Sequence, residues 1–222
     1  MKIIKPEVRP ISDINGEDIL LTIQRIAKTC YKSYKDSDNI ESAQRIVRQL
    51  IKSGHTSMLE FATITMNYIS NVAAYKDLTR QRLATFAVES TRYANYNKEK
   101  FGNELKFLEP VEFQKDSPEY EIWKQTMQVI EDNYMKLSKM GAKPDKKSLL
   151  LPHSLAAEFN IGANLREWRH ILSLRSSVAA TGHARPCIAQ IMDPTLELFH
   201  AKIPVIFDDL YEIYKQNKQQ SR

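Results

Sequence analysis

Arginine and hydroxyl side chains lie close together in one stretch of this sequence. The stretch reads Arg80-Gln81-Arg82-Leu83-Ala84-Thr85-Phe86-Ala87-Val88-Glu89-Ser90-Thr91-Arg92-Tyr93. Arginine presents a rigid fork of N–H donors that matches phosphate or carboxylate oxygens. The Ser90-Thr91-Arg92 triplet can add hydroxyl and backbone donors to the same anion. The stretch therefore predicts an anion-binding site, and a charged helix end followed by a partly exposed strand is the alternative.

A second basic stretch, from Ala163 to Arg175, has the spacing of a helix. A buried stripe is predicted at Leu165, Trp168 and Leu172. Arg166 and His170 are four residues apart and share another face. Arg175 lies about half a turn round the helix from Arg166. The two arginines cannot easily serve one compact site from one chain, but they could serve two sites that are each shared with another subunit. A solvated basic helix face is the alternative.

These segments together resemble the signature of flavin-dependent thymidylate synthases. That family carries Arg-His-Arg, seven residues and then Ser, which is similar to Arg80-x-Arg82-x7-Ser90. The segment His55-x-Ser57-x-x-Glu60 is a weak signal alone, since a capped helix would give it, but it resembles the family's upstream element. The C-terminal half matches in order at Leu151-Pro152, Asn164-x-Arg166 and Leu174-Arg175. The resemblance covers residues 2–207.

The resemblance implies an enzyme that methylates dUMP to dTMP. Members of the family use FAD, methylenetetrahydrofolate as the carbon donor and NADPH as the reductant. They form homotetramers in which each active site lies at a subunit junction, and the half-turn offset of Arg166 and Arg175 fits such an arrangement. Reduced flavin delivers a hydride to the pyrimidine ring, so no protein nucleophile is expected.

Individual roles also follow from the resemblance. The residues expected to border the flavin are Ser57, Arg80, Gln81, Arg82, Leu83, Asn164, Arg166 and His170. Those expected to hold the nucleotide are Asp77, Arg80, Glu89, Ser90, Thr91, Arg92 and Arg175. Two of them would act at the reacting ring: Arg175 would favour negative charge on the pyrimidine, and Ser90 would bind and orient the nucleotide.

The sequence departs from the family pattern at several of these positions. Gln81 replaces the central histidine, Ala87-Val88 replaces Asn-Glu, and Asp77 stands where a glutamine is common. An arginine that the family usually carries a few residues before Leu-Pro is missing, although Lys147 and Ser148 are nearby. The family's Gln-x-Glu-Ile-Arg element, which follows the last active-site arginine, appears here only as residues 181–185. A thymidylate synthase of divergent sequence is the preferred interpretation, and methylation or hydroxymethylation of dCMP is the alternative.

Bulk composition is compatible with this interpretation. The chain has 222 residues, of which 42% are hydrophobic and 27% charged, and a net charge of +5, with a pI near 9.0. Such charge favours anionic partners. Residues 1–6 carry no apolar signal segment and no run is long enough to span a membrane, so we expect a cytoplasmic protein. Gly-rich phosphate loops are absent, and the five histidines lack metal-ligand spacing, so no metal is expected.

Two other classes compete with the flavoenzyme interpretation. A folate-only synthase would need an activated cysteine, but Cys30 falls on a predicted apolar helix face and Cys187 lacks the right surroundings. A nucleic-acid-binding protein could use the basic and aromatic residues 92–98. No helix-turn-helix, zinc or RNA-recognition signature supports that class.

The elements that must position these residues form an α+β fold. We expect a mostly helical single domain (1–214) around a small mixed sheet, and a polar, frayed tail (215–222). Hydrophobic periodicity predicts strands at 2–11 and 61–69, and helices at 17–34, 39–52, 72–83 and 118–140. Asn71 is predicted to cap the helix that follows it. After Pro152 the chain is predicted to be helix-rich to Tyr214, with breaks at Pro186 and Pro194.

Overall fold

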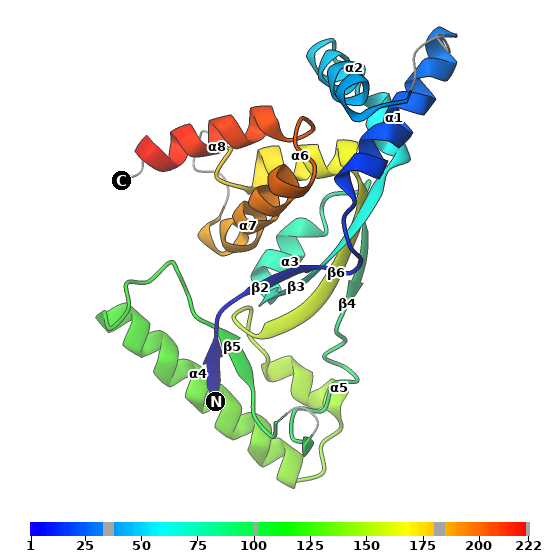
Figure 1. Cartoon of the computed structure of the whole chain (residues 1–222). Helices are drawn as coiled ribbons and strands as arrows, with labels where there is room; N and C mark the ends of the chain where they lie inside the picture. The colour runs from blue at the N-terminus through cyan, green and yellow to red at the C-terminus, as the bar shows by residue number, and fades with distance from the viewer. Residues whose placement is uncertain (33–37, 100–101, 180–184, 221–222) are drawn as a thin grey trace. The chain divides into compact units, whose positions relative to one another are not determined.

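The computed structural model describes residues 1–32, 38–99, 102–179 and 185–220 (Figure 1). Contacts group the chain into two compact units, each built from three segments. The first unit comprises residues 1–7, 68–80 and 86–160, and the second unit comprises residues 8–67, 81–85 and 161–222. None of the described helices is both long and apolar enough to cross a bilayer.

Helix α4 (Pro118–Lys139) and a small parallel sheet form the core of the first unit. Strands β1 (Lys2–Ile4) and β5 (Lys106–Leu108) pair with Ile3 opposite Phe107. Phe107 is buried against α4 in a cluster that also contains Trp123, Met127, Tyr134 and Leu155. The helix begins at Ser117, whose Oγ accepts a hydrogen bond from the Tyr120 backbone N–H at 3.2 Å.

Three short helices of the described residues also belong to the first unit. Helix α3 (Val72–Leu78) begins after Asn71, whose Oδ1 accepts a hydrogen bond from the Ala74 N–H at 2.8 Å, so the predicted cap is confirmed. Helix α5 (Pro144–Lys147) and the 3-10 helix η3 (Ser148–Leu150) follow α4. They lead directly into Leu151-Pro152.

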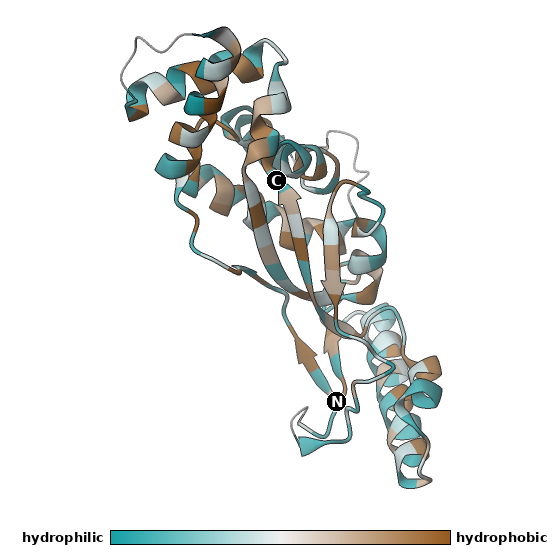
Figure 2. Cartoon of the chain, turned by 90° about the vertical axis from the view of Figure 1, so that its right-hand side faces the viewer, coloured by the Kyte–Doolittle hydropathy of each residue, from teal (hydrophilic) through white to brown (hydrophobic). Residues whose placement is uncertain are grey.

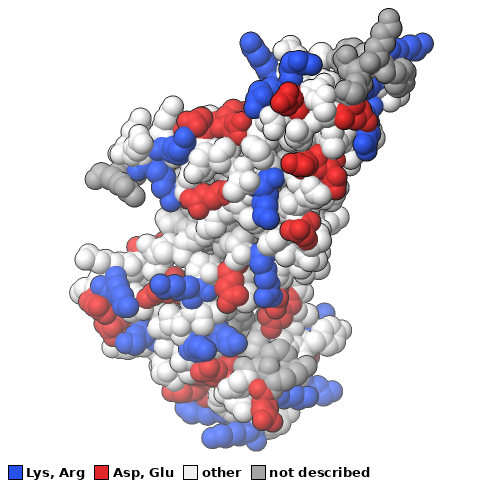
Figure 3. All heavy atoms as spheres, in the orientation of Figure 1, with Lys and Arg blue, Asp and Glu red and all other residues white. Residues whose placement is uncertain are grey.

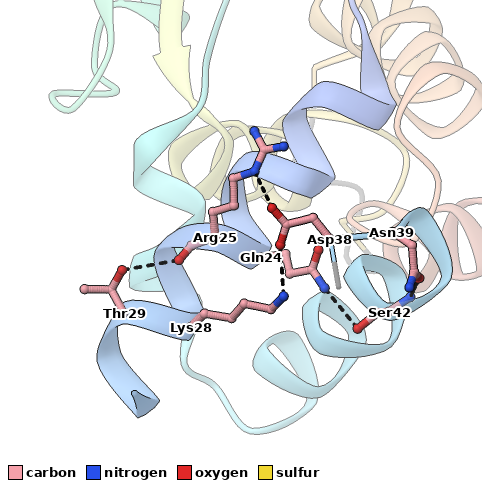
Figure 4. Close-up of polar contacts among 7 residues, drawn as sticks. All are labelled: Gln24, Arg25, Lys28, Thr29, Asp38, Asn39 and Ser42. Atoms are coloured by element: carbon pink, nitrogen blue, oxygen red, sulfur yellow. Dashed lines mark hydrogen bonds and ion pairs between the residues drawn. The ribbon is translucent and has the colours of Figure 1, made fainter. Parts of the chain in front are cut away.

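The second unit begins with a helical hairpin. Helices α1 (Gly16–Tyr31) and α2 (Ile40–Lys52) are capped by the side chains of Asn15 and Asn39. Figure 4 shows the polar contacts that join them: Asp38 accepts hydrogen bonds from Arg25 Nε at 2.8 Å and Lys28 Nζ at 2.9 Å, and Gln24 Nε2 donates to Ser42 Oγ at 2.9 Å. The 3-10 helix η1 (Thr56–Phe61) follows the hairpin.

Three C-terminal helices pack together in the second unit: α6 (Leu165–Arg175), α7 (Pro186–Lys202) and α8 (Asp208–Gln220). Trp168 is fully buried, meets Phe199 edge-on with ring centroids 5.2 Å apart, and donates a hydrogen bond to the Ile64 carbonyl at 3.0 Å. Arg169 forms a bidentate pair with Asp209 at 2.7 and 2.6 Å, which joins α6 to α8. The predicted buried stripe of α6 is therefore confirmed.

A four-stranded sheet has the order β2 (Glu7–Pro10), β3 (Thr63–Asn71), β6 (Ala156–Asn164), β4 (Thr85–Val88). Strands β3 and β6 each have residues in both units. Buried and partly exposed residues alternate along the second half of β6, from Phe159 onward. Figure 2 shows apolar and more polar segments alternating along these long strands. The predicted α+β class is confirmed, while the single domain of residues 1–214 stays a prediction.

Several predicted boundaries were wrong. Strand β6 lies in the region after Pro152 that was expected to be helix-rich, because its small residues conceal a period of two. Helix α3 ends at Leu78 instead of residue 83. Helix α7 continues through Pro194, and beside it the hydroxyl of Thr195 donates to the Ile191 carbonyl at 2.6 Å.

The C-terminal helix also continues further than predicted. Helix α8 runs past Tyr214 to Gln220. The segment expected to fray is anchored, because Asn217 Nδ2 donates hydrogen bonds to the carbonyls of Ser177 and Val178 at 2.9 and 3.2 Å. The end of the first predicted helix, residues 33–34, and most of the reduced element, residues 181–184, lie outside the described residues.

Candidate functional site

The arginine-rich stretch begins at the end of α3 and continues into β4. Arg80 is exposed just after the helix, whereas the side chain of Gln81 is buried at 7% exposure. A turn places the Ala84 N–H 3.3 Å from the Gln81 carbonyl, and Thr85 Oγ1 donates to the Gly162 carbonyl at 3.1 Å. Arg82 and Leu83 lie exposed in this turn. The turn is closed by the Gln81 backbone carbonyl, and the buried side-chain amide cannot carry a proton as a histidine would.

Glu89 and Ser90 are held in the first unit by a network of hydrogen bonds. The Glu89 N–H donates to the Glu158 carbonyl at 2.9 Å, and the Tyr96 hydroxyl donates to Glu89 Oε1 at 2.9 Å. Burial, and then the charge of Glu89, raise the pKa of Tyr96, so this phenol stays protonated as a donor. The Ser90 carbonyl accepts hydrogen bonds from the N–H groups of Tyr93 at 3.0 Å and Ala94 at 2.8 Å. The loop that begins at Glu89 is therefore fixed at both side chain and backbone.

A cavity of about 870 Å³ lies beside this loop in the first unit. Glu89 and Ser90 line it, whereas four other predicted nucleotide residues of this unit do not: Asp77, Arg80, Thr91 and Arg92. Three lysines (Lys2, Lys5 and Lys106) and four glutamates (Glu7, Glu89, Glu104 and Glu158) contribute to its wall. The wall has mixed charge, so charge alone does not identify it as a phosphate site.

Two of the eight predicted flavin residues line a different cavity, which belongs to the second unit; Arg80, Gln81, Arg82, Leu83, Asn164 and His170 do not line it. Ser57 from η1 and Arg166 from the first turn of α6 line a space of about 340 Å³, together with Cys30 and His55. The Leu165 N–H donates to the Ala62 carbonyl at 2.9 Å, which fixes the start of α6 against the end of η1. Segments far apart in sequence thus bring a hydroxyl and a guanidinium to one cavity.

The start of α6 determines where Arg166 points. Asn164 Oδ1 accepts a hydrogen bond from the Glu167 N–H at 2.9 Å and so serves as the helix cap. The guanidinium of Arg166 lies 2.5 Å from Glu60 Oε1, with both side chains about half exposed. Burial raises the pKa of the neighbouring Glu167 carboxyl. Because its only ion pair among the described residues is a solvent-exposed one, Arg166 can exchange Glu60 for an anionic ligand at small cost.

The remaining α6 residues do not join this cavity. His170 is exposed on the helix, and Arg175 lies at its last position. The Nε atom of Arg175 is buried and has no hydrogen-bond partner among the described residues. A buried unpaired donor on a guanidinium is costly, which suits an acceptor that arrives with a ligand. Helix α6 is continuous, so the half-turn offset between Arg166 and Arg175 stands.

Comparison with known proteins places these observations in one family. The model of the family described as thymidylate synthase complementing protein matches residues 16–205. The chain belongs to this family. A flavin-dependent thymidylate synthase of Pyrococcus abyssi is 30% identical over 163 residues, covering 69% of this chain and 66% of the relative. One of Corynebacterium glutamicum is 24% identical, covering 89% of this chain and 81% of the relative.

Solved structures agree on the fold. A UMP/dUMP methylase, PolB of Streptomyces cacaoi bound with 5-Br UMP, superposes with a TM-score of 0.74 at 17% identity and covers 96% of this chain and 97% of that one. The matches to the first two archaeal relatives span about two thirds of their length, 66% and 65%. The fold shared with the PolB methylase extends over almost the whole chain.

Several residues that shape the large cavity and its loop were not predicted. Glu158 and Tyr96 hold Glu89. The only feature of the sequence that could have indicated Glu158 is the strand pattern of β6. Lys147, near the position of the missing family arginine, is 1% exposed. Its Nζ points to Asn95 Oδ1 at 2.7 Å, so it cannot contact a ligand in place of that arginine.

Charge on the visible surface bears on the nucleic-acid alternative. Figure 3 shows basic and acidic side chains interspersed over the face in view, without a large area of one sign. A groove that tracks a nucleic-acid backbone needs continuous positive charge. This face therefore does not favour that alternative.

Proposed function

We propose that the protein transfers a one-carbon unit from methylenetetrahydrofolate to C5 of dUMP and reduces it to give dTMP. The observation that carries the proposal is the convergence of Ser57 and Arg166 on one cavity, in a chain whose Arg80-x-Arg82-x7-Ser90 spacing matches the family signature. A hydroxyl and an arginine fork suit the anionic part of FAD. The buried, unpaired Arg175 Nε supports a ligand acceptor at the other end of α6.

Each side chain has a distinct task in this proposal. Reduced FAD, when bound, would supply the hydride, and NADPH would return the oxidised flavin to its reduced form. Ser57 and Arg166 bind and orient the cofactor, and Arg166 releases Glu60 when it does so. Ser90 orients the nucleotide beside Glu89. Arg175 holds a fixed positive charge that favours negative polarisation of the pyrimidine ring.

Assembly and location complete the proposal. Arg166 and Arg175 face different directions from one continuous helix, and a homotetramer with sites at subunit junctions would let both reach ligands. We expect this assembly to act on free nucleotides in the cytoplasm.

The first test is the visible spectrum of the purified protein, titrated with FAD and then with dUMP. Flavin bands near ~370 and ~450 nm that dUMP perturbs are expected. Product analysis with methylenetetrahydrofolate and NADPH should then show dTMP. A protein that takes up no FAD, or that binds FAD and forms no dTMP, would contradict the proposal.

A different pyrimidine is the second candidate. Gln81 is buried, and Ala87 and Val88 are exposed on β4, where the family resemblance leads us to expect polar groups. The same titration with dCMP and UMP separates the candidates. If dCMP alone changes the spectrum and gives a methylated or hydroxymethylated product, then dCMP is the substrate in place of dUMP.

A further inference from the structure

Lys147 is a fully buried lysine in the first unit. Its side chain is 1% exposed, whereas Lys146, one residue earlier on α5, is exposed. The Nζ of Lys147 donates hydrogen bonds to Asn95 Oδ1 at 2.7 Å, Asn97 Oδ1 at 3.3 Å and Ser138 Oγ at 2.8 Å. An ammonium has three N–H donors, so all three are used.

The partners of Lys147 are unusual for a buried charge. They are two amides, a hydroxyl and the ring of Tyr134, whose centroid lies 4.6 Å from Nζ. Burial lowers the pKa of Lys147. Burying an ammonium without a carboxylate is expensive, and an apolar side chain would fill the same space more cheaply. A lysine at position 147 is therefore better explained by the arrangement of its hydrogen-bond partners than by a gain in stability.

Two of the hydrogen-bond partners of Lys147 belong to the loop that begins at Glu89, beside the large cavity. Asn95 and Asn97 flank Tyr96, and the Tyr96 hydroxyl donates to Glu89 Oε1 at 2.9 Å. At its other end the loop is closed by the hydrogen bond from the Ala94 N–H to the Ser90 carbonyl at 2.8 Å. Tyr96, Glu89 and Ser90 line the cavity, and Lys147 does not.

We propose that Lys147 is a positioning residue for the nucleotide site. It fixes Asn95 and Asn97, and through the adjoining Tyr96 it sets the orientation of Glu89. The same loop holds Ser90 through the N–H of Ala94. The role rests on the proposed function, because Glu89 and Ser90 matter only if the cavity takes the nucleotide. Lys147 lines neither the large cavity of the first unit nor the proposed flavin cavity of the second unit. Its loss should therefore affect nucleotide binding and spare flavin binding.

The test compares Lys147→Met with the matched control Lys146→Met in FAD-loaded protein. For Lys147→Met we expect the KM for dUMP to rise about tenfold, the value of one lost hydrogen bond. The kcat and the Kd for FAD should stay within about twofold of wild type. Lys146→Met should match wild type in all three constants. A purely structural lysine would lower the melting temperature and the active fraction and leave the KM for dUMP unchanged, which would overturn the proposal.

Two further variants keep the test decisive if Lys147→Met does not fold. Asn95→Ala removes one loop contact of Lys147, and Tyr96→Phe removes only the hydroxyl bonded to Glu89. Each should raise the KM for dUMP several-fold with FAD affinity retained, and an unchanged KM in both would refute the role. The binding of dUMP to wild type is measured first, so that a failure of the proposed function, which would remove this role too, is distinguished from a failure of Lys147 alone.

Discussion

Among the described glycines, Gly16 is the one at which an added methyl group would meet the closest neighbouring atom. A Cβ at this position would lie 1.9 Å from the backbone carbonyl oxygen of Lys202 and 3.2 Å from the Cα of Ile203. A relaxed carbon–oxygen contact is about 3.3–3.6 Å, so the overlap in Gly16→Ala is about 1.5 Å. The opposing atoms are backbone, so no side chain can rotate away, and α1 must separate from the end of α7.

The cost follows from this overlap. Overpacking typically costs about 1–3 kcal/mol, and a clash between two backbones belongs at the upper end. For a chain of this size each kcal/mol shifts the melting temperature by about 2–4 °C, so Gly16→Ala should melt about 6–12 °C below wild type. Helix α1 also supplies Cys30 to the cavity of Ser57 and Arg166, so FAD affinity of the folded variant should fall as well.

Gly54→Ala is the control. Gly54 has a φ of +73°, and no atom of the described residues lies within 4 Å of the position that a Cβ would take there. Its substitution therefore costs only the left-handed backbone, about 1–2 kcal/mol. Thermal melts followed by circular dichroism compare the two variants. If Gly16→Ala melts at or above the temperature of Gly54→Ala, the close approach of Gly16 to Lys202 is refuted.

Three further substitutions test other parts of the structure. Arg166→Lys should weaken FAD binding about tenfold, because a point charge replaces a planar fork. Arg48→Lys, at an exposed position of α2, is its control, and equal Kd values for the two variants would contradict the flavin role. Asn71→Ala removes the cap of α3 and should lower the free energy of unfolding by about 1 kcal/mol in urea titrations, and no change would contradict the cap. The hydrogen bond from Arg25, and then that from Lys28, hold the pKa of Asp38 below its ordinary value. The stabilising effect of the ionised Asp38 carboxylate is therefore present above the ordinary Asp pKa and is lost as pH falls through the pKa of Asp38 in the folded state. The difference between wild type and Asp38→Asn in urea titrations should be constant from pH 7 to 5 and vanish in acid, and a difference that grows in acid would contradict this contact.

Local signals accounted for much of the helical structure. Asn39, Asn71 and Ser117 stand where a side-chain oxygen can accept from the first turn, and each caps a helix. The Trp168 stripe follows the helical period and is buried. These features depend on residues three or four positions apart, which a sequence displays directly.

The features that the sequence did not reveal depend on distant partners. Strand β6 is rich in alanine, a helix former, and only its sheet neighbours make it a strand. Ser57 and Arg166 meet because the Leu165 N–H bonds to Ala62, a contact across about a hundred residues. Lys147 belongs to a run of lysines, and nothing local distinguishes the one that is buried.

Strand β6 links these findings, because one segment serves a different site in each unit. Glu158, near its start, accepts the hydrogen bond that fixes Glu89 in the first unit. Asn164, its last residue, caps α6 and thereby sets Arg166 in the second unit. Early substitutions in this strand should therefore act on the nucleotide site, and late ones on the flavin site. If both proposed sites are right, loss of dUMP affinity and loss of FAD affinity should be separable along a single strand, even though the proposed reaction requires both ligands together.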